Sequence, residues 1–467
     1  MVSKFLESRR SNAKKLVHEL RNNFKYVSIL GSDCTGKNYS VLKNTTDISE
    51  SWSTESGFVI KMTNGNAFYE YSLDDISSDT KKLAQKIISS LNISDELHKK
   101  EITSIEVEDE KMVKSFVREN DLHNYDDKYI IDRLSKYKDE LLSLSDNLLN
   151  GGAALITLEV NKLFITENKE LDQHYTWINA HLIAIYGEND NVINQREMTY
   201  SKDLKEALDM LEGKSAKLID KCKHLVNAKP ITPGVYDVIT DASITGLIAH
   251  EAFGHGVEMD QFVKDRALAK NYVGKYVASP ITNMKDGASS GLSTASYFFD
   301  DDGVLAHDTQ IIKDGILVSG ICDLTSSREL DFNPTGNGRR ETYKRKAYTR
   351  MTNTFIEKGN DKLSDMIKSI KHGYFLFETN NGMEDPKNWA IQCTAEYGIE
   401  IVDGKLTDNY VAPVVMSGNV LDLLKSISMI SDEFELEGAG SCGKGYKEWV
   451  RVSSGGPNLK CKVKLSW

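Results

Sequence analysis

The sequence lacks any long hydrophobic run, and this absence excludes membrane-spanning proteins. A transmembrane helix needs about 20 consecutive, predominantly apolar residues, and no stretch of this chain approaches that length. The first ten residues, MVSKFLESRR, carry charges where a secretory signal peptide needs an apolar segment. We therefore expect a cytoplasmic protein that makes no use of a membrane.

Cysteine and positive charge are also scarce. The six cysteines are scattered without paired spacing, which is typical of free thiols in a reducing compartment and argues against a disulfide framework. Aspartate and glutamate outnumber lysine and arginine by 69 to 58, so the net charge is −11. This balance argues against nucleic acid as a main partner.

Proline is absent from the first 229 residues, and glycine is sparse there. All seven prolines lie at or after Pro230, and only eight of the 32 glycines precede it. Because proline and glycine mark turns and linkers, residues 229–234 indicate a domain boundary. We predict an N-terminal domain, residues 1–229, and a C-terminal domain, residues 230–467.

The first domain mixes helical and strand-like patterns. Apolar residues recur at helical spacing in four segments, which are 3–24, 78–92, 126–149 and 201–226. Strand-like runs include 102–107 and 174–186, and further runs flank turn signals such as Asn64-Gly65. The mixture predicts helices packed on a sheet. We interpret this domain as a scaffold, a cleft wall and an oligomerisation surface.

The second domain is rich in glycine and has many short β-like runs. Turn signals such as Asp314-Gly315 and Asp403-Gly404 separate these runs, a pattern typical of a barrel-like or sandwich domain. The predicted fold class is therefore α+β, with helices on a sheet first and a mainly β, barrel-like domain second.

The stretch 241–260, DASITGLIAHEAFGHGVEMD, holds the residues best suited to chemistry. Apolar residues at helical spacing precede His250 and Glu251, which predicts a helix capped by Asp241 or Ser243. Imidazole is the commonest protein ligand for zinc, and a carboxylate beside a metal-activated water can act as a general base.

His250 and His255 stand five residues apart, in the order H-E-x-x-x-H. In the usual H-E-x-x-H the histidines are four apart and share a helix face, whereas five residues leave about 140° between them on a straight helix. One metal ion could take both only if the helix loosens. We expect this at or just after Gly254, where the backbone has most freedom.

A catalytic zinc ion needs three protein ligands and an open position, so a third ligand must come from elsewhere. Candidates are Glu258, His307 and the cysteines, and Cys442 stands out because the glycines of GAGSCGKG let the backbone come close. Spacing alone leaves a metal site and a hydrogen-bonded polar patch as equal interpretations.

Three further segments resemble ligand sites only superficially. Residues 31–37 and 438–444 match G-x-x-x-x-G-K but lack the context of a phosphate loop, so we interpret both as turns. Residues 299–303, FDDDG, lack the ligand spacing of a calcium loop, and we interpret them as a solvated turn.

Four motifs in fixed order resemble the TldD/PmbA family of metallopeptidases, on the TldD side. They are PGVYDV at 233–238, HEAFGH at 250–255 followed by Glu258 and Asp260, TGNGRR at 335–340 with RMTNT at 350–354, and SCGKG at 441–445. The catalytically inactive branch of that family lacks H-E-x-x-x-H, which this chain has.

The resemblance implies one zinc ion per chain. Its ligands would be His250, His255 and Cys442, with Glu251 as the general base. Glu258 would support the ligands without binding the metal.

The TGNGRR segment would contact substrate through Asn337, Arg339 and Arg340, because guanidinium groups suit peptide carboxylates and carbonyls. A structural ion pair is an equal alternative for the two arginines.

The function that the resemblance implies is hydrolysis of unfolded or short peptides, bound as an added β-strand in a closed cleft. It also implies a homodimer or a heterodimer with a family paralogue. The alternatives are a non-catalytic metal-binding partner subunit and a family member that acts on non-peptide amide or thioether substrates.

Overall fold

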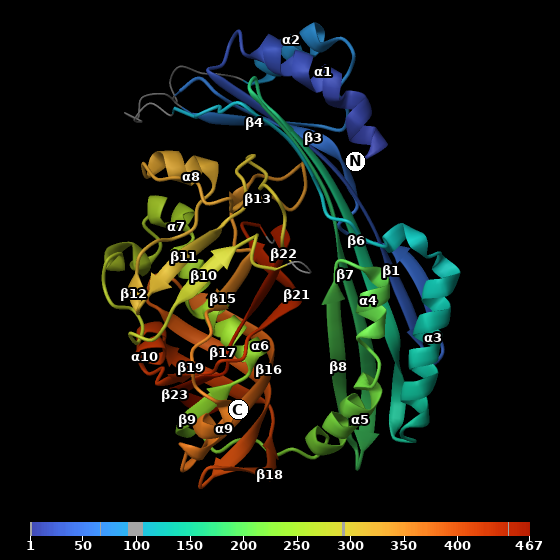
Figure 1. The fold of residues 1–467 in the computed structure, drawn as a ribbon, viewed down its shortest axis with the longest axis vertical. Helices are drawn as coiled ribbons and strands as arrows, with labels where there is room; N and C mark the ends of the chain where they lie inside the picture. The colour runs from blue at the N-terminus through green and yellow to red at the C-terminus, as the bar shows by residue number, and fades with distance from the viewer. Residues whose placement is uncertain (1, 66, 92–105, 292–294, 447) are drawn as a thin grey trace.

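The fold was determined as a computed structural model, which describes residues 2–65, 67–91, 106–291, 295–446 and 448–467. Two lobes face each other in Figure 1. The N-terminal lobe comprises the elements from α1 to α5, and the C-terminal lobe comprises those from β9 to β23. The prediction of two domains divided at residue 229 stays a prediction.

The N-terminal lobe is one eight-stranded sheet covered by helices. The strand order is β4-β3-β1-β6-β7-β5, with β2 paired to β1 and β8 paired to β7. The strands are β1 (Tyr26–Leu42), β2 (Thr46–Glu50), β3 (Glu55–Thr63), β4 (Phe68–Leu73), β5 (Met112–Val117), β6 (Leu148–Ile165), β7 (Lys169–Glu188) and β8 (Asn191–Ser201). The helices-on-sheet prediction is confirmed.

Two groups of helices pack on this sheet. The helices are α1 (Lys4–Leu20), α2 (Thr80–Ser90), η2 (Leu122–Asn124), α3 (Asp127–Ser143), α4 (Leu204–Asp209) and α5 (Lys214–Leu225). Helices α1 and α2 share one apolar core with β1, β3 and β6, and α3 to α5 share another with β1, β6 and β7. The predicted helix 201–226 is divided, because Gly213 adopts a left-handed conformation (φ 76°) between α4 and α5. Most of the predicted strand 102–107 lies outside the described residues.

The C-terminal lobe contains a closed barrel and an open sheet. The barrel runs β16-β9-β23-β19-β17 and closes by pairing of β16 with β17, so the barrel-like prediction is confirmed. Strands β18 and β20 pair with β17 and β23. The bounds are β9 (Gly234–Thr240), β16 (His372–Asp385), β17 (Ala390–Val402), β18 (Lys405–Val411), β19 (Val414–Asn419), β20 (Met429–Ile430) and β23 (Leu459–Ser466).

The open sheet has six strands in the order β12-β11-β10-β15-β22-β21. Its strands are β10 (Met284–Gly287), β11 (Asp308–Lys313), β12 (Ile316–Leu317), β15 (Asn353–Ile356), β21 (Glu435–Lys444) and β22 (Glu448–Gly456). A short pair, β13 (Gly338–Arg339) and β14 (Tyr348–Thr349), lies beside it. Strand β21 forms one edge of this sheet and points toward the N-terminal lobe in Figure 1.

A run of helices lies between the barrel and the open sheet. It comprises α6 (Ala242–Leu247), η3 (Ile248–Gly254), η4 (His255–Val257), α7 (Met259–Val263) and η5 (Leu268–Tyr272), and the lobe also has α8 (Leu324–Glu329), α9 (Leu363–Lys368) and α10 (Val420–Lys425). The largest apolar core of the protein surrounds α6 and η3 and includes residues of both sheets. The candidate site is therefore supported by a large apolar core of the lobe.

Both glycine-lysine segments are strands. Residues 31–37 lie within β1, and residues 438–444 lie within β21. Our interpretation of these segments as turns was wrong, because β1 continues through its glycines to pair with both β3 and β6.

Buried ion pairs join the two lobes at three consecutive aspartates. Asp300, Asp301 and Asp302 are each at most 5% exposed, and Lys162 and Lys61 from the N-terminal sheet pair with Asp301 and Asp302. The prediction of a solvated turn was wrong. The neutralising lysines lie 139 and 241 positions away in the sequence, so the local pattern could not reveal them.

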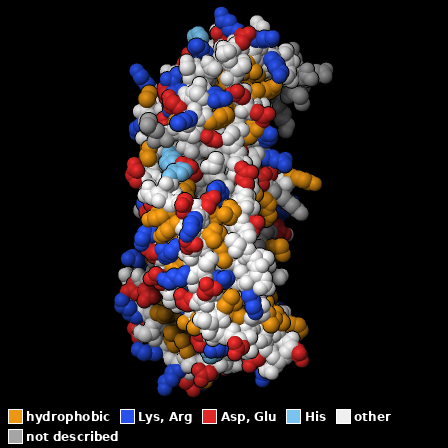
Figure 2. Space-filling model, turned by 90° about the vertical axis from the view of Figure 1, so that its right-hand side faces the viewer, with side chains coloured by type: hydrophobic (Ala, Val, Ile, Leu, Met, Phe, Trp, Pro, Cys, Tyr) orange, Lys and Arg blue, Asp and Glu red, His pale blue; other side chains and the backbone are white. Residues whose placement is uncertain are grey.

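No helix in the described ranges is long and apolar enough to cross a membrane. The face drawn in Figure 2 intermixes basic and acidic side chains.

Candidate metal centre

The segment before His250 forms a short buried helix, as the apolar pattern predicts. Asp241 caps helix α6, and its side chain accepts a hydrogen bond from the Ile244 backbone N–H at 2.8 Å. Gly246 lets α6 lie directly on β22, because a Cβ there would come within 2.5 Å of the Gly455 backbone nitrogen. The start of the helix is thus fixed by a cap and by close contact with the open sheet.

After Leu247 the chain changes from α-helix to π-helix, and this change accounts for the five-residue spacing. Element η3 is a π-helix, in which each backbone N–H bonds to the carbonyl five residues earlier. The backbone N–H of His255 accordingly donates to the carbonyl of His250. The two histidines therefore follow one another on the same side of the helix.

The predicted loosening is present, but our location for it was wrong. It begins at Ile248, before both histidines, and Gly254 itself has ordinary helical angles (φ −59°, ψ −47°). Gly254 is instead required for space, because a Cβ there would lie 2.2 Å from the sulfur of Met351. Packing, and not backbone freedom, explains glycine at this position.

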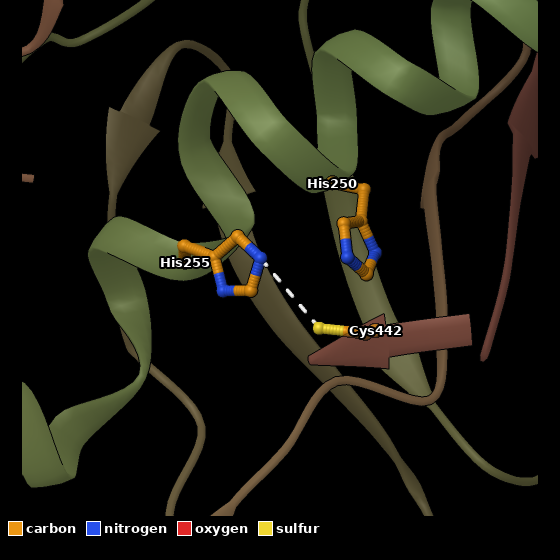
Figure 3. Close-up of side chains that lie close together, drawn as sticks. All are labelled: His250, His255 and Cys442. Carbon is orange, nitrogen blue, oxygen red and sulfur yellow. Dashed lines mark hydrogen bonds between the residues drawn. The ribbon is translucent and has the colours of Figure 1, made fainter. Parts of the chain in front are cut away.

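The structure brings Cys442 to the two histidines. Their ligand atoms all lie within 4.8 Å of one another, and Cys442 Sγ is 3.6 Å from His255 Nε2. The two imidazole rings are nearly perpendicular, at 84°, with centroids 5.1 Å apart. Figure 3 shows both rings and the thiol converging on one point between η3 and β21.

The other candidate third ligands are placed differently. Glu258 Oε2 lies 3.2 Å from His255 Nδ1, on the ring nitrogen opposite the one that faces the thiol. His307 contacts the carbonyl of Leu305 and is not part of the convergent group. The geometry thus favours Cys442 among the residues that the sequence left open.

The electrostatics of the trio suit a cation. Burial alone would raise the pKa of the Cys442 thiol, but the facing His255 and His250 hold this pKa well below its usual range. Burial likewise opposes protonation of His255, yet the Cys442 thiolate and Glu258 raise its pKa well above the usual value. Within the described residues, the buried Nδ1 of His250 has no hydrogen-bond partner. Two imidazoles and a thiolate form a donor set that fits zinc.

A buried charge network supports His255 from behind. Lys444 Nζ lies 3.0 Å from Glu258 Oε2 and 2.7 Å from Asp260 Oδ1, and it donates to the Thr349 carbonyl at 2.8 Å. Burial opposes ionisation of Glu258, but Lys444 and His255 lower its pKa to about 2. Sequence reasoning missed Lys444, although its position two residues after Cys442 on one strand was a usable signal.

Glu251 lies beside the trio without belonging to it. Its two carboxylate oxygens are 3.9 Å from His250 Nε2 and 3.7 Å from His255 Nε2. The side chain is 20% exposed and lines the same cavity as the three donors. It is therefore within reach of a water molecule held at the trio.

Arg350 is a second residue that sequence reasoning passed over. Its fully buried guanidinium donates to the carbonyls of Cys442 and Glu448, which lie on β21 and β22. These bonds fix the backbone that presents the thiol.

The TGNGRR residues lie apart from the trio and are bound to protein groups. Asn337 donates to Asp286 at 2.7 Å, and Arg339 donates to the carbonyls of Met351 and Arg451 at 2.7 Å each. Arg340 pairs with Glu70 of the N-terminal lobe at 3.1 Å. These contacts favour the structural alternative for the arginines, and their role in substrate binding stays a prediction.

The trio opens into a cleft between the lobes with a volume of about 870 Å³. One wall is formed by β8 and α5 of the N-terminal lobe, and the other by α6, η3, β16, β17 and β21. A cleft of this size lies in the range of small-molecule and peptide sites. An α+β protein with two histidines, a thiol and a carboxylate at the base of an interlobe cleft has the features of a metalloenzyme.

Comparisons with known proteins identify relatives of this chain. Residues 233–464 match the model of the PmbA/TldA metallopeptidase C-terminal domain. A metalloprotease TldD homolog of Haemophilus influenzae is 33% identical over 239 residues, which cover 50% of this chain and 49% of the relative. A zinc metalloprotease TldD homolog of Saccharolobus solfataricus is 31% identical over 244 residues, 51% of this chain and 54% of the relative.

The chain belongs, through residues 233–464, to the TldD/PmbA family. Its matches to curated relatives span about half of their length in most cases, from 47% to 70%. The crystal structure of TldE from Thermococcus kodakarensis covers 98% of this chain and 100% of its own, with a TM-score of 0.77 at 18% identity. At that identity the likeness shows a shared fold.

Proposed function

We propose that this protein is a zinc-dependent peptidase that hydrolyses unfolded or short peptides in the interlobe cleft. The observation that carries the proposal is the convergence of His250, His255 and Cys442 beside Glu251 in one cavity. The names of the relatives, which include a zinc metalloprotease, support the same activity.

The donors would hold one zinc ion per chain, with Glu258 fixing the His255 ring through Nδ1. Zinc bound there would supply Lewis acidity to the scissile carbonyl and to the attacking water. Glu251 would accept the proton of that water, because its two oxygens lie 3.9 Å from His250 Nε2 and 3.7 Å from His255 Nε2, on the cleft side of the trio. It would then return the proton to the leaving amine.

The position of β21 supports binding of the peptide as an added strand. This strand is the edge of the open sheet, it carries Cys442, and it lines the cleft. An extended peptide paired along the outer edge of β21 would pass directly over the metal centre. Such recognition reads the backbone and therefore tolerates many sequences.

The accessibility of the site supports a catalytic role over a purely structural metal site. Structural zinc sites are closed by four protein ligands, whereas this trio has three and lines an open cleft. This difference favours the peptidase over the non-catalytic subunit and leaves the non-peptide amide or thioether substrates as the alternative chemistry.

We further propose that the protein works as a dimer in the cytoplasm, either with itself or with a family paralogue. The shared fold with TldE supports pairing within the family. All six cysteines, each of them in the described part of the chain, are free thiols, which supports a reducing compartment.

The deciding experiment combines metal analysis with degradation of an unfolded peptide. Purified protein should contain zinc and cleave the peptide, a chelator should abolish cleavage, and added zinc should restore it. If the protein contains zinc but cleaves no peptide, the result would favour one of the alternatives, a non-catalytic subunit or an enzyme that acts on non-peptide substrates.

A further inference from the structure

The two signs of charge are unequally distributed in the cleft. Seven carboxylates line it, against three cationic side chains among the described residues. The cations are Arg196, Lys214 and Lys217. Besides Glu251, the carboxylates are Glu197, Asp241, Glu378, Glu396, Glu435 and Glu437. Acidic side chains therefore outnumber basic ones along the path that a peptide would take.

The lysines of this wall are already occupied. Lys214 and Lys217 both approach the same carboxylate, Glu197, at 3.3 and 3.5 Å. The adjoining Lys221 contacts Glu197 at 3.4 Å and crosses to Glu378 at 2.9 Å. These ammonium groups neutralise Glu197 and Glu378 and do not reach the carboxylates of β21.

The carboxylates of β21 lie on the same face as the metal-binding thiol. Cys442, Glu437 and Glu435 pair with Val450, Ser454 and Gly456 of β22, which alternate onto one face of the sheet. A bulge between Gly438 and Gly440 preserves this relationship. The β22 partners of Cys442 and Glu437, Val450 and Ser454, are four positions apart. Four positions correspond to a distance of about 13 Å along the strand.

These carboxylates repel one another. Burial, followed by the neighbouring Asp241, raises the pKa of Glu437 to about 8. Burial, followed by the charges of Glu378 and Glu435, raises the pKa of Asp241 to about 7 despite two backbone hydrogen bonds. A cationic group entering this part of the cleft would lower these pKa values, and the ionised carboxylates would then accept charge-assisted hydrogen bonds from it.

We propose that the cleft selects peptides with a lysine or arginine about four residues from the bond that is cleaved, held by Glu435 and Glu437. The spacing follows from the distance along β21, because an extended peptide advances about 3.3 Å per residue. The proposal rests on the proposed peptidase function and adds a side-chain preference to its backbone recognition.

The test uses a neutral peptide with one cleavable bond and a single lysine moved through each position on both sides. Matched peptides carry glutamine or glutamate in place of the lysine. We expect kcat/KM to be about tenfold or more higher for lysine than for glutamine at the favoured position, with glutamate lowest, as for a charge-assisted contact. Equal values for the three peptides at every position would overturn the proposal.

Variants assign the preference to β21. Glu435→Gln with Glu437→Gln should remove most of the lysine preference, and Glu435→Lys should shift it toward glutamate. Glu433→Gln is the matched control, because Glu433 is exposed on the same segment and does not line the cleft. A lysine preference that survives in the double variant would exclude these carboxylates as its source.

Binding measurements keep this proposal separate from the proposed activity. The same peptides, labelled for fluorescence anisotropy, are titrated into the zinc-loaded Glu251→Gln variant, which needs no hydrolysis. If the lysine peptides bind more tightly to the variant but the wild-type protein cleaves none of them, the result would support the cationic preference and count against the peptidase function. Turnover with equal affinities would support the peptidase and overturn the preference.

Discussion

The sulfur of Cys442 lies 3.6 Å from Nε2 of His255, although 187 positions separate the two residues in the chain. One belongs to an edge strand and the other follows a π-helix. Their contact depends on the packing of α6 and η3 against β22, and on the hydrogen bonds that Arg350 gives to the Cys442 and Glu448 carbonyls. The predictions below test separate parts of this arrangement.

Cys442→Ser tests the thiol as a metal ligand. A hydroxyl binds zinc far more weakly than a thiolate, so the zinc content should fall sharply while the circular dichroism spectrum stays that of the wild type. The neighbouring Ser441→Ala variant should keep its zinc. Full zinc occupancy in Cys442→Ser, measured after dialysis by elemental analysis, would exclude this residue from the ligand set.

Glu251→Gln tests the general base. The substitution keeps the size of the side chain and removes its ability to take a proton, so the rate of peptide hydrolysis should fall by roughly 10²–10⁴-fold. Zinc content and peptide affinity should change little. Loss of zinc would instead make Glu251 part of the metal site, and near-normal activity would place the base elsewhere, with Glu258 examined next.

Gly246→Ala tests the contact of α6 with the open sheet. The added Cβ would meet the backbone of Gly455 and Ser454 at 2.5 and 2.7 Å, and a paired strand cannot move aside. We expect a loss of about 1–3 kcal/mol in the free energy of unfolding, together with weaker zinc binding, because His250 moves with the helix. Gly443→Ala is the control, since the atoms nearest to its Cβ would be those of the partly exposed Trp449 ring, at 3.2 Å and beyond. Unchanged urea unfolding in Gly246→Ala would contradict the packing argument.

Lys444→Met tests the charge network behind His255. Removing this buried ammonium leaves Glu258 and Asp260 without their neutralising partner. Breaking a buried pair in this way costs about 3–5 kcal/mol. Lys264→Met, which removes a partly exposed contact of 3.6 Å to the same Asp260, should cost less than about 1 kcal/mol. Equal effects of the two substitutions on thermal unfolding would argue against a supporting role for Lys444.

Glu55→Gln tests a pH dependence located between the lobes. Glu55 accepts a hydrogen bond from the Tyr343 backbone N–H at 2.9 Å, and burial raises its pKa from 4.5 to about 7. Because the folded pKa is the higher one, this group's stability contribution is complete below pH 4.5 and is lost as the pH rises to about 7. Wild type and variant should therefore differ little at pH 5, and the variant should be more stable at pH 8, on the order of 2 kcal/mol. Urea unfolding at both pH values measures this difference, and parallel pH profiles would refute it.

Local patterns were sufficient for part of the site. The apolar spacing before His250 predicts the helix, the acidic residue at its start predicts the cap, and the five-residue interval requires a loosened helix. The interval could not locate the loosening at Ile248, because the π-helical register depends on packing against β15 and β16, which lie more than 100 residues later.

Long-range partners account for most of what local patterns could not predict. The burial of Asp300 to Asp302 depends on lysines of the other lobe, and the contacts of Arg340 depend on Glu70. Glycine at position 254 suggested freedom of the backbone, whereas the neighbouring Met351 sulfur is the reason for it. In each case the physical cause lies in a segment distant in sequence, which the local pattern does not contain.

The strand order of the open sheet also sets a sequence of events during synthesis. Strand β21 has β22 as its sheet partner, and β22 in turn pairs with β15. Because β22 follows β21 in the chain, the thiol cannot be seated beside the histidines until residues up to 456 have left the ribosome. An incomplete chain still in translation would therefore carry both histidines and yet be unable to assemble the centre.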